Sequence, residues 1–129
     1  MIMELGLWLI EVNIEETKAL YSRLEACECS YCQNYALAME NLCTMEEKCF
    51  FTQFGINYEK PFYLSEFDEG CSHLYIGIFF IPGKIINTIP IDESYEFRVG
   101  RFSIDGIIPK GDEIQLRCET VFPWVLDNH

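Results

Sequence analysis

The sequence predicts an α+β fold, a mostly antiparallel β-sheet or sandwich with a helical hairpin inserted at about residues 30–55. The first observation is that apolar residues alternate with a period of two near the N-terminus and again after Pro61, as in strands. The second is that apolar residues between these regions recur at spacings of three and four, as in amphipathic helices. The third is that the 129 residues are half hydrophobic and contain no linker or repeat, so we expect one globular domain spanning residues 1–129.

Residues 3–12 predict the first strand. Alternate positions place leucines on one face and mostly apolar residues on the other, which is the pattern of a covered strand. Residues 14–25 are ambiguous, because Asn13 followed by Glu16 fits a capping box and favours a helix, whereas an alternating pattern favours a hairpin partner of the first strand. We expect a strand here, because an extended segment of ten residues needs a neighbour for its backbone groups.

The first helix of the hairpin is predicted over residues 30–43. Ser30 followed by Gln33 fits a capping box, in which the hydroxyl and the amide bond backbone groups that the helix start leaves free. Its apolar residues recur at spacings of three and four and form one stripe: Tyr31, Tyr35, Met39, Leu42 and Cys43.

The second helix begins at once with another capping box, made by Thr44 and Glu47. Three phenylalanines supply its buried face. Gly55 is expected to end it in the left-handed conformation, with Ile56 making the hydrophobic contact that accompanies such a cap. Pro61 then prevents any further helix.

Strands are predicted again beyond this proline. Residues 62–67 form a short strand, and residues 68–70 form a turn. Residues 72–81 are apolar on both faces, so we expect a central strand that Pro82-Gly83 ends.

The last third of the chain predicts two more strands. The apolar residues from Tyr95 to Val99 keep one phase of the alternation, which Phe102 and Ile104 do not share. Gly100 lies between them and predicts a β-bulge that turns both halves towards the core. A final, half-solvated strand is expected to face the core with Ile114, Leu116, Cys118 and Thr120.

The chain carries 21 acidic and 9 basic side chains, a formal net charge of −12. Such a polyanion repels phosphate backbones, so we expect no nucleic-acid partner and favour a protein partner with a basic surface. No apolar run approaches the roughly 20 residues of a membrane-spanning helix, and the N-terminus lacks the basic region of a signal peptide. We therefore expect a cytoplasmic protein without a membrane partner, in which the seven cysteines stay reduced.

Cys27-x-Cys29-x-x-Cys32 is the one cysteine spacing in the chain that could carry chemistry. A fourth ligand from Cys71, His73, Cys43 or Cys49 would complete a zinc site, and Cys71 would make it a four-cysteine site. Cys29 and Cys32 at a helix start would also suit a redox dithiol, because the helix dipole stabilises a thiolate. A second pair with similar spacing is absent, so we expect the cysteines to pack between sheet and hairpin without a cofactor, with zinc as the alternative.

Two other residues could belong to a site. His73 lies on the predicted central strand, where a packed, hydrogen-bonded histidine is more common than a general base without a linked nucleophile. Asn34, on the first turn of a helix, is expected to bond the backbone of the incoming loop. No set of residues supplies a nucleophile, a base and an oxyanion donor together, so we expect binding rather than catalysis.

Four short segments occur in an order that resembles a group of bacterial proteins. Cys29–Tyr35 is similar to C-x-Y-C-x-N-(F/Y), and Phe54–Pro61 to F-G-I-x-x-x-K-P. His73–Gly77 resembles H-L-Y-x-G, and Phe122–Leu126 resembles a terminal I-P-W-V-L. The group comprises small, acidic, uncharacterised proteins, mainly of Gram-positive anaerobes, and the resemblance covers residues 5–126.

The resemblance implies an intracellular stand-alone domain with a strand at residues 17–24. Cys27 and Cys71 match no position of the group, which counts against the four-cysteine zinc site. The resemblance also implies a candidate binding constellation: Cys29, Cys32, Asn34, His73 and Trp124.

The function expected from the sequence is a non-catalytic protein-binding module. An immunity- or antitoxin-like role would suit a small acidic protein by analogy, because toxic enzymes of nucleic acid are often basic. The alternative is a zinc-binding or thiol redox protein that uses Cys29 and Cys32.

Overall fold

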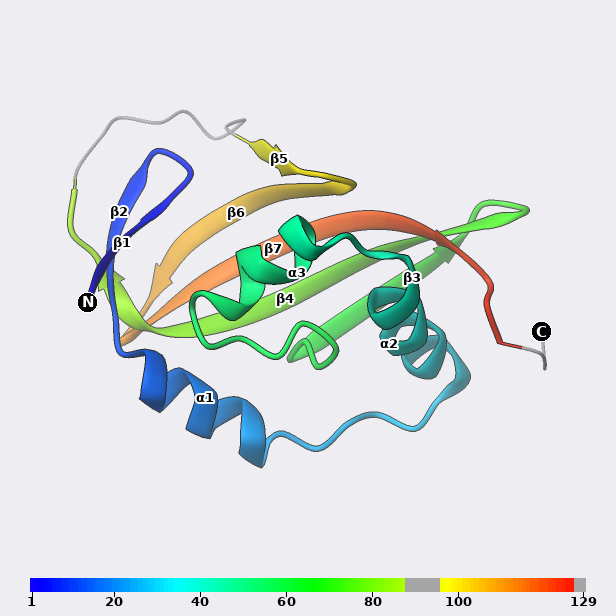
Figure 1. Cartoon of the computed structure of the whole chain (residues 1–129), viewed down its shortest axis with the longest axis horizontal. Helices are drawn as coiled ribbons and strands as arrows, with labels where there is room; N and C mark the ends of the chain where they lie inside the picture. The colour runs from blue at the N-terminus through cyan, green and yellow to red at the C-terminus, as the bar shows by residue number, and fades with distance from the viewer. Residues whose placement is uncertain (88–95, 127–129) are drawn as a thin grey trace.

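Figure 1 shows a computed structural model of the chain, and the structure describes residues 1–87 and 96–126. In these residues seven strands form one antiparallel sheet accompanied by three helices, which confirms the predicted α+β class. The helices are α1 (Ile14–Arg23), α2 (Ser30–Leu42) and α3 (Met45–Thr52). The strands are β1 (Ile2–Leu5), β2 (Trp8–Val12), β3 (Tyr63–Asp68), β4 (Ser72–Ile85), β5 (Phe97–Val99), β6 (Phe102–Lys110) and β7 (Glu113–Pro123).

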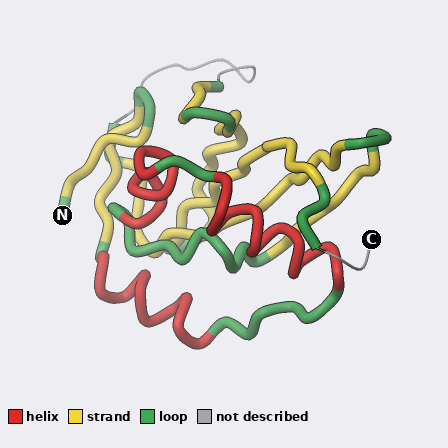
Figure 2. The backbone as a smooth tube through the Cα atoms, turned by 45° about the vertical axis from the view of Figure 1, so that its right-hand side comes forward, coloured by secondary structure: helices red, strands yellow, loops and turns green. Residues whose placement is uncertain are grey.

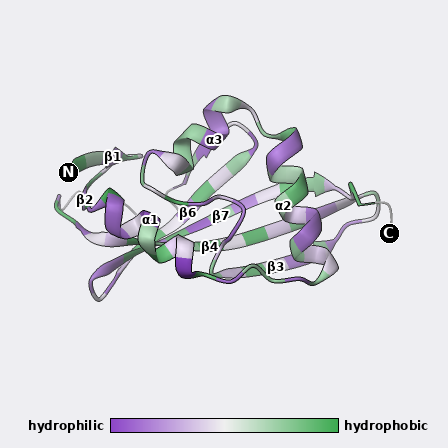
Figure 3. Cartoon of the chain, turned by 60° about the horizontal axis from the view of Figure 1, so that its bottom comes forward, coloured by the Kyte–Doolittle hydropathy of each residue, from purple (hydrophilic) through white to green (hydrophobic). Residues whose placement is uncertain are grey.

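The strand order is β1-β2-β4-β7-β6-β5, and β3 also pairs with β4. α2 and α3 lie on one face of the sheet, while α1 runs beside its edge (Figures 1 and 2). Hydrophobic and hydrophilic bands alternate along the strands (Figure 3). Successive side chains of a strand point to opposite faces, and every second side chain of β4 from His73 to Ile81 is buried. Phe51 of α3 packs there against Phe79 and Phe102, with ring centroids 5.3 Å away in each case, and all three rings are fully buried. Among the described residues, no helix has both the length and the apolar character needed to cross a membrane.

The N-terminal segment is a hairpin, so the prediction of one strand over residues 3–12 was wrong. β1 and β2 pair across a two-residue loop, with Leu5 opposite Trp8. Gly6 has a φ of 61°, and glycine at the first position of such a loop reaches this left-handed conformation without a steric cost. The alternation continued through the turn, which is why the sequence did not reveal it.

The predicted strand at residues 14–25, and the strand at 17–24 that the resemblance implied, were also wrong. The segment is the helix α1, and Asn13 caps it by accepting a 3.0 Å hydrogen bond from the backbone N–H of Glu16. Thr17 and Tyr21, four residues apart, are its buried positions. The backbone groups of β2 pair with β1 and β4, so residues 14–25 are not needed as a further strand beside β2.

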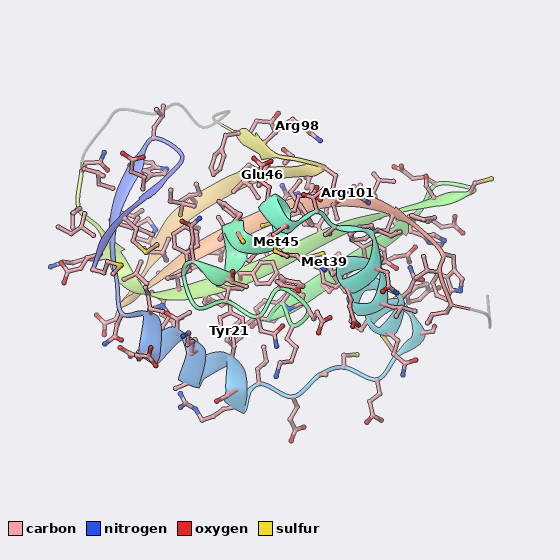
Figure 4. All side chains as sticks on the ribbon, in the orientation of Figure 1. Tyr21, Met39, Met45, Glu46, Arg98 and Arg101 are labelled. Carbon is pink, nitrogen blue, oxygen red and sulfur yellow. The ribbon has the colours of Figure 1, made fainter. Side chains whose placement is uncertain are left out.

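Tyr21 joins α1 to a gap in the edge of β4. β3 pairs with β4 as far as Ile78, and β2 begins to pair at Gly83. Phe80 lies between them, and the Tyr21 hydroxyl donates to its carbonyl at 2.9 Å and accepts from its N–H at 3.0 Å (Figure 4). Burial is the main cause that raises the pKa of Tyr21, so the hydroxyl stays protonated and keeps both roles.

Replacing Tyr21 with phenylalanine should lower the free energy of unfolding by about 2 kcal/mol, because both backbone groups of Phe80 lose their partner. Urea denaturation would measure the change. The matched control is Tyr63→Phe, because Tyr63 is 66% exposed. Loss of its hydroxyl should lower the free energy of unfolding by less than about 0.5 kcal/mol. Equal destabilisation of the two variants would contradict this role of Tyr21.

The helical hairpin is present, but its first helix starts differently from the prediction. Cys29, rather than Ser30, is the N-cap of α2, and its Sγ accepts a 3.4 Å hydrogen bond from the backbone N–H of Cys32. Gln33 reaches back as predicted, although its amide donates to the carbonyl of Glu28 at 2.8 Å. The cap therefore lies one residue earlier, and a thiol takes the place that a hydroxyl usually has.

The predicted ends of α3 are confirmed. Thr44 and Glu47 form the capping box. At the other end Gly55 has a φ of 88°, and the N–H of Ile56 donates to the carbonyl of Phe51 at 3.3 Å, which is the bond of a Schellman cap. Ile56 is 2% exposed and belongs to the same buried core cluster as Phe51.

β4 continues beyond the predicted end at Pro82-Gly83. Pro82 pairs with Glu113 of β7, and the strand then pairs with β2 as far as Ile85. Strand alternation turns the nitrogen of Pro82 towards the gap between β3 and β2, so no ladder hydrogen bond is lost there. β3 lies within one residue of its predicted span.

The predicted bulge at Gly100 was wrong. Gly100, with a φ of 59°, lies in the turn that joins β5 to β6, and the bulge lies instead between Asp105 and Ile108. A hairpin turn and a G1 bulge both place a glycine at positive φ, so the glycine alone did not distinguish them. Tyr95 lies outside the described residues. The last strand is confirmed, with these side chains buried: Ile114, Leu116, Cys118 and Thr120.

Candidate functional site

Three thiols meet where the loop from α1 enters α2, at the end of the molecule where the segment that follows β7 also lies (Figure 1). The Sγ atoms of Cys27, Cys29 and Cys32 all lie within 4.8 Å of one another. Cys27 and Cys29 are exposed, and Cys32 is half-buried. We call these residues the thiol cluster. Its three sulfur ligands could hold a metal ion.

The first turn of α2 makes the thiols of Cys29 and Cys32 unequal. The backbone N–H of Cys32 is the main cause that lowers the pKa of Cys29, and a hydrogen bond from the Cys27 thiol adds to it. Burial is the main cause that raises the pKa of Cys32, followed by its hydrogen bonds to the other two thiols. Cys29 is therefore the thiol of this pair that ionises first.

The four-cysteine zinc site is not assembled. Cys71 is exposed in the turn between β3 and β4 and does not belong to the thiol cluster. Among the described residues no other His, Cys, Asp or Glu joins the three thiols. All seven cysteines of the chain are free.

A groove borders the thiol cluster, and the sequence did not predict it. It has a volume of about 410 Å³ and lies between the α1–α2 loop, the first turns of α2 and the segment that enters β3. Cys27 and Cys32 contribute to its wall. Its remaining apolar lining comes mainly from Leu24, Ala26, Tyr35, Ala36, Pro61, Phe62, Tyr63 and Leu64.

Two carboxylates lie at this groove. Glu25 is exposed and Glu59 is half-buried, and both line it. Burial is the main cause that raises the pKa of Glu59, and the negative charge of Glu40 adds to it. Lys60 is the basic residue of the lining, and its Nζ donates to the carbonyl of Leu24 at 3.0 Å, which ties the two walls together. The groove is therefore an apolar slot with acidic groups beside it.

Comparisons with protein families, with curated proteins and with solved structures found no match to the chain. The chemistry of the groove and of the thiol cluster is therefore what supports a functional proposal.

A wider depression of about 910 Å³ lies at the other end of α1. It is lined by residues such as Met1, Asn13 and Gly83, and it contains none of the candidate site residues that the sequence indicated. It is also more open to solvent than the groove beside the thiol cluster, which makes the groove the better binding site.

Asn34 has a structural role. The residue is fully buried, and its amide donates to the Tyr75 hydroxyl at 3.0 Å and to the Pro123 carbonyl at 3.2 Å. Its carbonyl oxygen accepts from the N–H groups of Val125, at 2.6 Å, and Leu126, at 3.3 Å. Asn34 thus fixes the C-terminal segment to α2, and not the incoming loop that was expected to be its partner.

His73 and Trp124 come together as a second group of candidate residues. The Nδ1 atom of His73 lies 2.5 Å from a carboxylate oxygen of Glu66, and its ring lies 5.3 Å from that of Trp124. His73 is 2% exposed, which fits the packed, hydrogen-bonded strand histidine predicted from the sequence. Tyr31 links the two groups, because it stands between Cys29 and Cys32 in the chain and packs edge-on against Trp124 at 5.8 Å.

Proposed function

We propose that the protein is a non-catalytic module that binds a basic segment of a partner protein in the groove beside the thiol cluster. The observation that supports this is an apolar slot of about 410 Å³ that carries Glu25 and Glu59, in a chain of net charge −12. Arginine and lysine combine an apolar stem with a cationic head, so their side chains match both parts of such a slot.

Electrostatics favours the same kind of partner. A net charge of −12 steers basic surfaces towards the protein before contact, and most strongly at low salt. A bound cation would also offset the repulsion between Glu59 and Glu40, which raises the pKa of Glu59 in the free protein. The groove volume lies within the range of ordinary ligand sites, so one or two anchoring side chains would fill it.

The proposal extends to the compartment and to the biological role. Free thiols are kept reduced in the cytoplasm, so we place the protein there. An immunity- or antitoxin-like role, in which an acidic protein occupies a basic surface of a toxic enzyme, is the form of partner binding that suits this chain. This step rests on analogy with other small acidic inhibitors.

Fluorescence anisotropy with a labelled peptide that alternates leucine and arginine would test the groove. We expect a dissociation constant on the order of 10–100 µM at low salt and weaker binding at about 0.3 M salt. A peptide with glutamate in place of arginine should not bind. The double variant Glu25→Gln, Glu59→Gln should bind the basic peptide at least about tenfold more weakly.

The matched control is Glu15→Gln, Glu16→Gln, which removes the same charge from the first turn of α1. Those two residues line the wider depression and not the groove, so this variant should bind the peptide like the unmodified chain. Equal loss in both double variants would mean that only net charge attracts the peptide. Equal binding of the acidic and basic peptides would also refute the proposal.

A further inference from the structure

We propose that Cys27, Cys29 and Cys32 bind one Zn²⁺ ion through three thiolates and leave its fourth coordination position open to an external ligand. The three Sγ atoms already lie within 4.8 Å of one another, and they come from six consecutive residues. Zinc is bound by thiolates without a redox change, and each thiol that becomes a ligand releases its proton to solvent.

The geometry requires only a small contraction. A tetrahedral zinc ion with Zn–S bonds of about 2.3 Å holds its sulfurs about 3.8 Å apart, so each pair needs to close by about 1 Å at most. Cys27 belongs to the irregular loop and Cys29 is the N-cap, so only Cys32 is held inside a helix. The adjustment would therefore fall on the loop and would leave α2 in place.

The first turn of α2 also supplies a neighbouring hydrogen bond. The N–H of Cys32 donates to the Sγ of Cys29 at 3.4 Å, and this bond would persist when that sulfur is a metal ligand. Donors of this kind orient ligands and offset part of the thiolate charge. Glu25 and Glu28 lie in the same loop and are exposed, so they would attract a dication to the cluster.

The open position follows from the ligand count. Among the described residues three thiols gather and no fourth ligand residue joins them. Three protein ligands with one external ligand are the pattern of zinc sites that exchange water for another molecule, whereas structural sites have four protein ligands. Cys27 and Cys29 are exposed, so a water molecule, an imidazole or a small thiol could reach the metal.

Cobalt(II) titration of the reduced, chelator-treated full chain would test the site. We expect one Co²⁺ per chain, a near-ultraviolet charge-transfer band with the intensity of three thiolates, and displacement by Zn²⁺. Added imidazole should shift the visible bands without releasing the metal, because it occupies the open position. Absence of a thiolate band, or visible bands that imidazole does not change, would overturn the three-thiolate site or its open position respectively.

Cys29→Ser is the decisive variant, because serine is a good N-cap and α2 should keep its start. It should lower the cobalt and zinc affinities by at least about 100-fold, whereas circular dichroism should stay unchanged. The controls are Cys49→Ser and Cys71→Ser, since both residues are exposed and lie outside the cluster. Loss of the band in these controls, or its persistence in Cys29→Ser, would overturn the proposal.

This zinc site does not depend on the proposed binding of basic segments. Cys29 does not line the groove, so Cys29→Ser should still bind the arginine peptide, and the metal titration uses no peptide. Failure of one proposal would therefore be visible without failure of the other.

Discussion

Replacing Asn34 with alanine is expected to lower the free energy of unfolding by about 3–4 kcal/mol, one of the two largest effects of a single substitution proposed for this protein. The amide is fully buried and makes four hydrogen bonds, to Tyr75, Pro123, Val125 and Leu126. Alanine would leave the buried Tyr75 hydroxyl and the partly buried backbone groups of the C-terminal segment without this partner. A buried polar group without a partner costs about 1–3 kcal/mol, and a partly buried group costs less.

Two measurements would check this result. Urea denaturation gives the loss of stability, and hydrogen exchange should show faster exchange of the Val125 and Leu126 amides, because Asn34 accepts from both. Asn41→Ala is the matched control, since it lies on the same helix and is exposed. If exchange of the two amides did not change, the C-terminal segment would be held by contacts other than Asn34.

Local chemistry was enough to predict the elements whose ends are set by neighbouring residues. The capping box of Thr44 and Glu47 and the left-handed Gly55 depend on residues within one or two turns, and both are confirmed. β7 was predicted for a similar reason, because its alternation of buried and half-exposed residues is unbroken.

The predictions that failed depended on which segment pairs with which. Residues 14–25 fitted both a helix and a strand, and the choice was made by β1, which pairs with β2 and so removes the need for another neighbour. Gly6 and Gly100 are both at positive φ in hairpin turns. The alternation continued through Gly6, and the change of phase at Gly100 fitted a bulge as well as a turn.

The candidate site divides in the same way. The thiol cluster follows from the spacing of Cys27, Cys29 and Cys32 at a helix start, so the sequence could indicate it. The exclusion of Cys71 depends on where the β3–β4 turn lies, which only the sheet decides. The groove was missed because separate segments of chain form it, and no periodic pattern marks their residues.

Glu47 shows how a local motif acquires a long-range role. Its side chain is 3% exposed, and one oxygen accepts from the Thr44 N–H at 2.7 Å as part of the capping box. The other oxygen accepts from the Arg101 N–H at 2.6 Å, in the turn between β5 and β6, and lies 3.4 Å from the Nε of the same residue. A Cβ on Gly100 would collide with this carboxylate, so glycine at this position of the turn permits the close approach of Glu47.

Glu47→Gln is therefore expected to lower the free energy of unfolding at neutral pH by about 2–3 kcal/mol, because hydrogen bonds to a charged acceptor are lost. Burial alone would raise the pKa of Glu47, but the N–H groups of Arg101 and Thr44 and the Arg101 charge outweigh it and lower the pKa. A depressed folded-state pKa stabilises the protein above the unfolded-state value of about 4.3, and this stabilisation is lost as the pH falls through the folded-state pKa.

The stability gap between the unmodified chain and Glu47→Gln should accordingly be widest at neutral pH and should close below about pH 4. Urea denaturation across this range would measure it. Glu46→Gln is the matched control, because Glu46 is exposed in the same first turn of α3 and feels the same helix dipole. A stability gap that stays constant with pH would mean that the packing of Glu47, and not its charge, stabilises the protein. An equal gap in Glu46→Gln would mean that the effect comes from the helix dipole and not from the contact between α3 and the β5–β6 turn.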